Sequence, residues 1–96
     1  MLTIPRIKAI VTPICARYGV VKTYLFGSYA RGEATEKSDV DLCVELGKIK
    51  SLWTLSAFRL DLVDALGKEV DIVSAPPKRE DFRRELARDE VLLYAA

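Results

Sequence analysis

Apolar residues recur along the first part of the chain at the spacing of a helix, three or four positions apart. The residues on this face are Ile4, Ile7, Val11, Ile14 and Tyr18. Gly19 is expected to end this helix, because glycine is the usual residue just past a helical C-terminus. Pro13 falls inside the pattern, where a proline costs about 3 kcal/mol. We therefore expect either a kink or a restart with Thr12 as N-cap and Pro13 at the first helical position.

A second helical pattern covers residues 51–66, with Ser51 as a suitable N-cap and Gly67 as the residue that ends it. Its expected core face consists of Leu52, Leu55, Phe58, Leu62, Val63 and Leu66. A third, charged helix is expected over about Arg79–Arg88. The basic residues there alternate with acidic ones, which favours a solvated face over a surface for an acidic partner or RNA. These basic residues are Lys78, Arg79, Arg83, Arg84 and Arg88.

Three segments are typical of strands. Val20–Phe26 is rich in β-branched and aromatic residues, Asp39–Leu46 alternates between apolar and polar positions, and Glu69–Ser74 follows the second helix. The sequence VLLYAA, residues 91–96, fits either a last helical turn or a short edge strand. Helices and strands that alternate in one short chain predict an α/β (α+β) fold, with a small mixed β-sheet and flanking helices.

Composition narrows the classes of function. The 96 residues predict a single domain, 1–96, and a formal charge of +1 gives no field for tight binding to long nucleic acids. The chain contains no histidine, which excludes Ser-His-Asp and Cys-His catalysis and zinc held by histidine. No apolar run approaches the roughly 20 residues of a membrane span. Cys15 and Cys43 do not form a CxxC pair, and two reduced cysteines in an intracellular protein are a simpler interpretation than a single disulfide. We therefore expect a cytoplasmic location and no membrane partner.

The strongest candidate chemistry lies in the acids of the predicted strands. Asp39 and Asp41 are two positions apart, so both side chains leave the same face with Cα atoms about 6.5–7 Å apart. This spacing suits one divalent cation or a pair of them. Asp71 lies in the next predicted strand, and all three acids can meet if the two strands are neighbours. Oxygen ligands favour Mg²⁺ first and Mn²⁺ second, whereas acids that only face solvent are the simpler alternative.

A second motif, Gly27-Ser28, stands between a predicted strand and a short helical turn that spans Tyr29–Arg31 and ends at Gly32. Glycine lets a bound group approach the backbone, and the first N–H groups of a helix point outward, so this turn suits the β- and γ-phosphates of a nucleotide. Most Gly-Ser turns are only turns, and the chain has no GxxxxGK[ST] pattern. The motif gains weight because it lies one strand away from the acids.

Together these motifs resemble the minimal nucleotidyltransferases of the DNA polymerase β superfamily. The residues that carry the resemblance are Gly27-Ser28-Tyr29-Ala30-Arg31-Gly32-Glu33, then Ser38-Asp39-Val40-Asp41-Leu42, then Val70-Asp71-Ile72-Val73. It implies an α/β fold with a small mixed sheet.

The resemblance also implies roles for individual residues. Gly27 and Ser28 would hold triphosphate, and Asp39 and Asp41 would bind two Mg²⁺ ions. Asp71 would complete one metal site and activate the acceptor hydroxyl. Arg31 is left with two roles, a contact with phosphate or an ion pair with Glu33 or Glu36.

The implied reaction transfers a nucleoside monophosphate, most simply AMP from ATP, to a hydroxyl group. The chain ends soon after its third predicted strand, so little of it remains to enclose an acceptor. Small members of this kind resemble the antitoxins whose partners are helical HEPN-domain ribonuclease toxins. Such antitoxins transfer AMP to a tyrosine of the toxin, which the resemblance therefore implies as the acceptor. The alternatives are a non-catalytic antitoxin that binds nucleotide or toxin and acts by occlusion, and transfer to a small molecule or an RNA end.

Three residues are open to two interpretations each. Trp53 and Tyr29 lie off the expected core faces and could anchor an interface, although partial burial is the favoured expectation for Trp53. Cys43 shares a strand face with the acids, where a thiolate could bind metal, but a small buried side chain is the favoured interpretation. The sequence leaves a homo-oligomer open.

Overall fold

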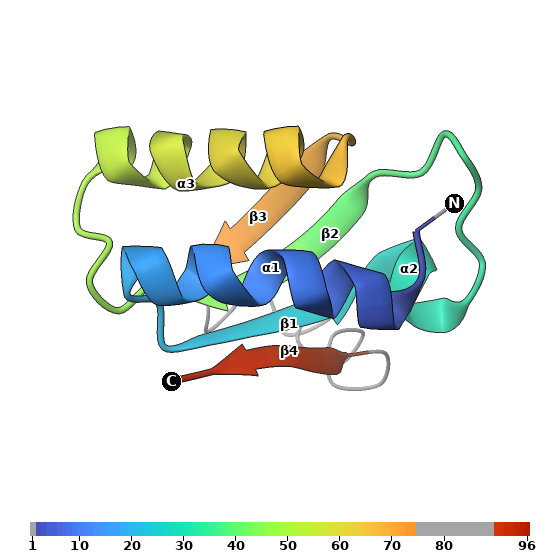
Figure 1. Cartoon of the computed structure of the whole chain (residues 1–96), viewed down its shortest axis with the longest axis horizontal. Coiled ribbons are helices and arrows are strands. Elements are labelled where there is room, and N and C mark those ends of the chain that lie inside the picture. Colours follow the sequence, from blue (N-terminus) through green and yellow to red (C-terminus); the bar gives the residue numbers. More distant parts are fainter. Residues whose placement is uncertain (1, 75–89) are drawn as a thin grey trace.

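The computed structural model describes residues 2–74 and 90–96 of the chain (Figure 1). Two long helices, α1 (Ile4–Tyr18) and α3 (Leu52–Leu66), lie side by side on one face of a four-stranded sheet. The strands are β1 (Lys22–Phe26), β2 (Val40–Glu45), β3 (Val70–Ser74) and β4 (Val91–Ala95). A short helix, α2 (Gly27–Arg31), follows β1 directly. The predicted charged helix and its basic cluster lie outside the described residues.

The sheet is mixed, which confirms the predicted fold class. Its strand order is β3-β2-β1-β4, with β1 antiparallel to both β2 and β4 and with β2 parallel to β3. A parallel pair needs a crossover connection, and α3 supplies it between β2 and β3. This crossover makes the two acid-bearing strands direct neighbours.

The main core lies between the sheet and the two long helices. Alternation along β2 turns Val40, Leu42 and Val44 into this core, while Asp41 points to the other face. From α3, Phe58, Leu62 and Leu66 are buried, and Leu55 and Val63 pack against them partly exposed. The expected core position of Leu52 is wrong, since this side chain is 80% exposed.

Helix α1 runs without a break through Pro13, so the alternative in which the helix restarts at Thr12 is wrong. Thr3 is the N-cap, and its side chain accepts a hydrogen bond from the N–H of Arg6 at 3.2 Å. The Thr12 hydroxyl donates to the Lys8 carbonyl at 2.7 Å instead of capping a new helix. Gly19 ends the helix in the left-handed conformation, as expected.

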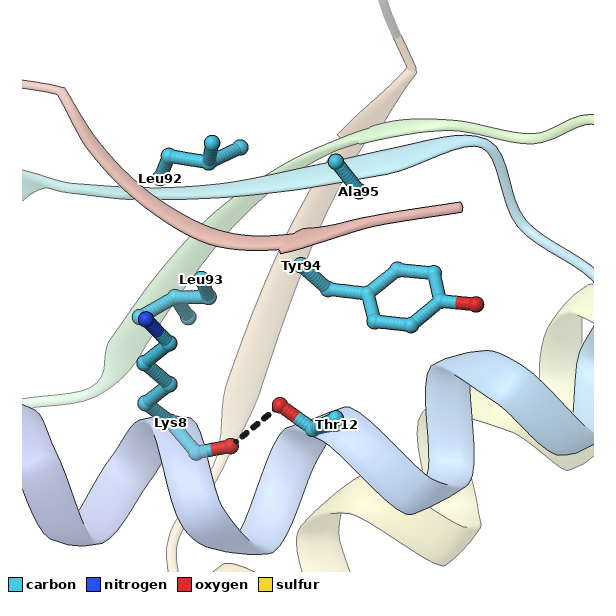
Figure 2. A pocket seen from close by; sticks show the side chains of 6 residues that line it. All are labelled: Lys8, Thr12, Leu92, Leu93, Tyr94 and Ala95. Carbon is cyan, nitrogen blue, oxygen red and sulfur yellow. Dashed lines mark hydrogen bonds between the residues drawn. The ribbon is translucent and has the colours of Figure 1, made fainter.

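The tail forms an edge strand, β4, which decides between the two alternatives for residues 91–96. It pairs with β1 through an irregularity between Thr23 and Tyr24, and Leu93 enters the main core. A cavity of about 280 Å³ opens between α1 and β4 (Figure 2). Its lining residues are Lys8, Thr12, Leu92, Leu93, Tyr94 and Ala95, none of which belongs to the predicted site. In the described part of the chain, no helix is long and apolar enough to cross a membrane.

Candidate active site

The acids of the two parallel strands meet on the face of the sheet that the long helices do not cover. Asp41 of β2 and Asp71 of β3 are partners in the strand register. Each has apolar neighbours that turn into the main core, Val40 and Leu42 beside Asp41, and Val70 and Ile72 beside Asp71. Strand alternation therefore places both carboxyl groups on the outer face, next to each other.

Asp41 is half-buried, and the pKa of its carboxyl group is raised to about 6. Loss of hydration is the largest cause, followed by the negative charge of Asp71 and a side-chain hydrogen bond with it. The charge of Asp39 raises this pKa further, and the positive charge of Arg31 lowers it. Burial and the neighbouring carboxylates both disfavour the charged form of Asp41. The site is thus poised to accept positive charge.

Gly27 passes directly over Asp41 where β1 turns into α2. A Cβ atom built on Gly27 would lie 2.3 Å from Oδ2 of Asp41, which is far too close for any side chain. The φ angle of +72° also requires the left-handed conformation that favours glycine. The half-buried Ser28 follows Gly27 directly, at the end of β1 where Phe26 pairs with Asp41. The two sequence motifs are therefore adjacent in space.

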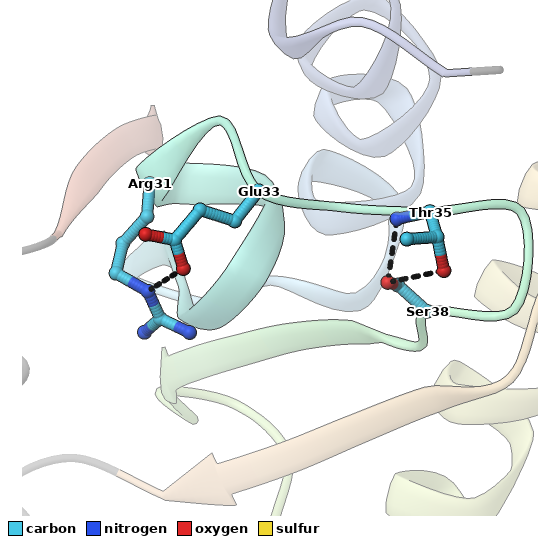
Figure 3. A network of polar contacts seen from close by, with 4 residues as sticks. All are labelled: Arg31, Glu33, Thr35 and Ser38. Carbon is cyan, nitrogen blue, oxygen red and sulfur yellow. Dashed lines mark hydrogen bonds and ion pairs between the residues drawn. The ribbon is translucent and has the colours of Figure 1, made fainter.

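Arg31 is the last residue of α2 and forms an ion pair with Glu33, with 3.0 Å between Nε and Oε2 (Figure 3). The alternative of a surface ion pair with Glu33 is thus found in the structure. Arg31 also lies close enough to lower the pKa of Asp41. Contact between Arg31 and phosphate stays a prediction.

Asp39 lies one residue before β2, and its side chain is exposed. The preceding residues form a closed turn in which the Thr35 N–H donates to Oγ of Ser38 at 2.8 Å (Figure 3). The Ser38 N–H donates back to the Thr35 carbonyl at 3.0 Å. Sequence reasoning did not assign a role to this turn, although a threonine and a serine three positions apart before an acid are a recognisable signal for one.

The donor set is suited to a hard divalent cation. Asp39, Asp41 and Asp71 offer only carboxylate oxygens, and the negative charges of Asp71 and Asp39 disfavour ionisation of Asp41 unless positive charge is supplied. Among residues 2–74 and 90–96, no three acidic, cysteine or histidine side chains lie close enough together to form a complete metal site in this conformation. Asp41 and Asp71 form the adjacent pair, while the exposed Asp39 lies just before β2.

Cys43 lies two residues after Asp41 in β2 and on the same face of the sheet. It is only 1% exposed and packs with Phe26, Tyr24 and Val73. Burial is the main cause that raises the pKa of its thiol, which disfavours the thiolate that a metal would need. The favoured interpretation of Cys43 as a small buried residue is confirmed.

Two side chains differ from expectation. Trp53 is 87% exposed on the outer face of α3, so its expected burial is wrong. Tyr29 is 4% exposed and belongs to the main core, so it is not an exposed interface anchor. Within the described residues its hydroxyl has no hydrogen-bond partner.

Comparison with known proteins identifies the family of this chain. The sequence profile of the nucleotidyltransferase domain family matches residues 7–94. A Methanocaldococcus jannaschii protein, provisionally named a protein adenylyltransferase, is 44% identical over 73 residues, which cover 76% of this chain and 78% of that protein. The protein adenylyltransferase MntA of Thermococcus cleftensis is 36% identical over 95 residues, or 95% of this chain and 96% of that protein.

Solved structures share the fold. A chain provisionally identified as a minimal nucleotidyltransferase has a TM-score of 0.75 at 35% identity, covering 94% of this chain and 95% of that chain. A toxin–antitoxin structure with AMP-PNP has a TM-score of 0.78 at 20% identity, covering 93% of this chain and 73% of that chain. A complex of a tri-AMPylated Shewanella oneidensis HEPN toxin with an MNT antitoxin has a TM-score of 0.72 at 17% identity, covering 98% of this chain and 74% of that chain.

Proposed function

Because the chain belongs to the nucleotidyltransferase domain family, we propose that it is a protein adenylyltransferase that moves AMP from ATP to a tyrosine hydroxyl of a HEPN-type toxin. In this role it acts as the antitoxin. The observation that carries the proposal is the register pair of Asp41 and Asp71, with Gly27 packed against Asp41. This arrangement joins the acids to the turn that would receive the triphosphate.

Each residue of the site has a role that its position supports. Gly27 leaves room for phosphate beside the backbone, and Ser28, the next residue of α2, offers a hydroxyl donor. Asp39, Asp41 and Asp71 would hold two Mg²⁺ ions, or Mn²⁺ in their place. When bound, such ions supply charge neutralisation to the triphosphate and the leaving pyrophosphate.

The transfer itself needs a base and an in-line acceptor. Asp71 is exposed on the outer face and is the carboxylate best placed to take the proton of an incoming tyrosine hydroxyl. The tyrosine oxygen then forms a bond to the α-phosphorus, and the bond between that phosphorus and the bridging oxygen breaks, so that pyrophosphate leaves. The raised pKa of Asp41 means that its ionised form, which binds a cation, is disfavoured until a cation offsets the surrounding negative charge.

The choice of partner rests on the relatives. MntA of Thermococcus cleftensis is named a protein adenylyltransferase, and a structural neighbour is an MNT antitoxin bound to a tri-AMPylated HEPN toxin. A further structural neighbour is a toxin–antitoxin structure with AMP-PNP. An acceptor hydroxyl that is delivered by a second protein also suits an acid pair lying on an outer sheet face rather than inside the main core.

The test uses the purified chain, Mg²⁺, ATP labelled at the α-phosphate, and as acceptor the protein encoded by the adjacent gene. We expect label on the partner with the wild type and none with Asp39→Ala or Asp41→Asn. Asp64→Asn is the matched control, because it removes an exposed carboxylate from α3 without touching the acid pair. Absence of label transfer by a wild-type preparation that binds ATP would refute the proposal.

A second candidate function is neutralisation of the toxin by occlusion alone. The feature that favours it is the outer face of α3, where Leu52, Trp53 and Leu60 are 80%, 87% and 56% exposed. The two candidates separate in one experiment. Under occlusion the Asp39→Ala and Asp41→Asn variants still protect cells from the toxin, whereas under adenylyl transfer they do not.

A further inference from the structure

Asp39 differs from Asp41 in how the fold holds it. Asp41 lies inside β2, paired in register with both neighbouring strands. Asp39 lies before the strand begins, and the first link to β3 comes one residue later, where the Val40 N–H donates to the Glu69 carbonyl at 3.0 Å. The sheet therefore constrains Asp39 from its C-terminal side only. Any constraint from the other side has to come from the loop that follows α2.

That loop contains the Thr35–Ser38 turn, which is closed by hydrogen bonds in both directions. Figure 3 shows the contacts of the Ser38 hydroxyl with Thr35. The Ser38 hydroxyl accepts from the Thr35 N–H at 2.8 Å and lies 3.4 Å from the Thr35 hydroxyl. The Ser38 N–H donates to the Thr35 carbonyl at 3.0 Å, and the Lys37 N–H donates to Oγ1 of Thr35 at 3.3 Å. Both the backbone and the side chain of Ser38 are thus tied to Thr35.

A further hydrogen bond connects the same loop to the segment that leads into β3. The Lys68 ammonium group donates to the carbonyl of Glu36, which lies inside the turn. Lys68 stands just before β3, the strand that carries Asp71. The loop before Asp39 is therefore anchored both on itself and at the entry to the second acid-bearing strand.

We propose that Ser38 is a positioning residue. Through its turn with Thr35 it holds the backbone of Asp39, so that the Asp39 carboxylate stays near Asp41. The inference rests on the proposed function, because it takes Asp39 to be a cation ligand. A carboxylate on an untethered loop pays conformational entropy on binding a cation, and a closed turn removes part of this cost in advance. Ser38 acts through Asp39 and does not itself touch the cation.

The chain contains a matched control for this turn. Ser51 caps α3, where its hydroxyl accepts from the Thr54 N–H at 3.1 Å and lies 3.0 Å from the Thr54 hydroxyl. The same two residue types thus make the same two side-chain contacts, away from the acids. Ser38→Ala and Ser51→Ala remove equivalent exposed hydrogen bonds, so a general loss of stability affects both variants alike.

The experiment measures binding of Mn²⁺ alone to the metal-free protein by electron paramagnetic resonance, and in parallel the Mg²⁺ dependence of AMP transfer. We expect Ser38→Ala to weaken Mn²⁺ binding roughly three- to tenfold, the effect of losing about one hydrogen bond of positioning. Ser51→Ala should stay within about twofold of the wild type, and Ser38→Thr should restore binding because it keeps the hydroxyl. The maximal rate at saturating Mg²⁺ should change less than the Mg²⁺ requirement.

Equal weakening in Ser38→Ala and Ser51→Ala, or a wild type that binds no Mn²⁺, would overturn the positioning role. If the wild type transfers AMP while the two serine variants behave alike, only this inference fails. If Ser38→Ala selectively loses Mn²⁺ but the wild type transfers no AMP, the positioning role stands and the proposed function fails. Should Ser38→Ala not fold, Thr35→Val serves instead. It keeps both hydrogen bonds between the Thr35 backbone and Ser38, and it loses the contacts of the Thr35 hydroxyl with Ser38 and with the Lys37 N–H.

Discussion

Replacing Asp41 by Asn should make the metal-free protein more stable while abolishing its activity. The ordinary pKa of aspartate is about 4, and in the folded chain that of Asp41 is raised to about 6. One pKa unit corresponds to about 1.4 kcal/mol, so the ionised side chain destabilises the fold by at most about 3 kcal/mol at neutral pH. Asp41 is partly open to water, and solvent screening lowers this value to about 1–2 kcal/mol. An asparagine of nearly the same shape removes the repulsion.

The sign of the pH dependence follows from the raised pKa. The folded chain holds the Asp41 proton up to about pH 6, whereas the unfolded chain releases it near pH 4. Stability from this group is therefore fully present below about pH 4 and is lost as the pH rises through 6. The advantage of Asp41→Asn over the wild type should be largest above pH 7 and should shrink as the pH falls from 6 towards 4.

The assay is urea unfolding in buffer with a chelator, repeated with added Mg²⁺, for the wild type, Asp41→Asn and the control Asp64→Asn. Mg²⁺ should raise the stability of the wild type and of Asp64→Asn but not that of Asp41→Asn. The reasoning is refuted if Asp41→Asn is less stable than the metal-free wild type at pH 7.5, or if Mg²⁺ stabilises this variant equally.

Two further substitutions test the packing around the site. Gly27→Ala should lower the stability clearly more than Gly32→Ala does, and it should abolish AMP transfer. Both glycines have positive φ angles, at which a residue with a side chain costs about 1–2 kcal/mol. Only Gly27 also lies against Asp41. Equal losses in urea unfolding would contradict this account. Tyr29→Phe should leave stability unchanged or raise it by about 1 kcal/mol, since it removes a buried hydroxyl without a partner in the described residues. A clear loss in thermal unfolding would mean that this hydroxyl has a partner.

The sequence predicts the site face well because strand alternation is a local property. Asp41 and Cys43 share one face of β2 simply because they are two positions apart, while Val40, Leu42 and Val44 form the core side. The strand begins one residue later than predicted, so Asp39 lies just outside it. Helix ends are similarly local: Ser51 and Gly67 delimit α3 as expected, through an N-cap hydrogen bond and a left-handed C-cap.

What the sequence could not predict depends on contacts between distant segments. The register of Asp41 with Asp71 is decided by the α3 crossover, and the tail becomes strand β4 only because β1 offers it an edge. Helix α3 carries apolar side chains nearly all round, so periodicity alone could not tell that Leu52 and Trp53 face outward. The close approach of Gly27 to Asp41 also exists only in the folded chain.

Mass spectrometry of the HEPN-type partner after incubation with ATP, Mg²⁺ and this protein tests the central claim most directly. The account predicts that a tyrosine of the partner gains adenylyl groups with the wild type and with Asp64→Asn, and that it gains none with Asp41→Asn. A partner that stays unmodified by an ATP-binding wild type, or one that is modified equally by Asp41→Asn, would contradict the account.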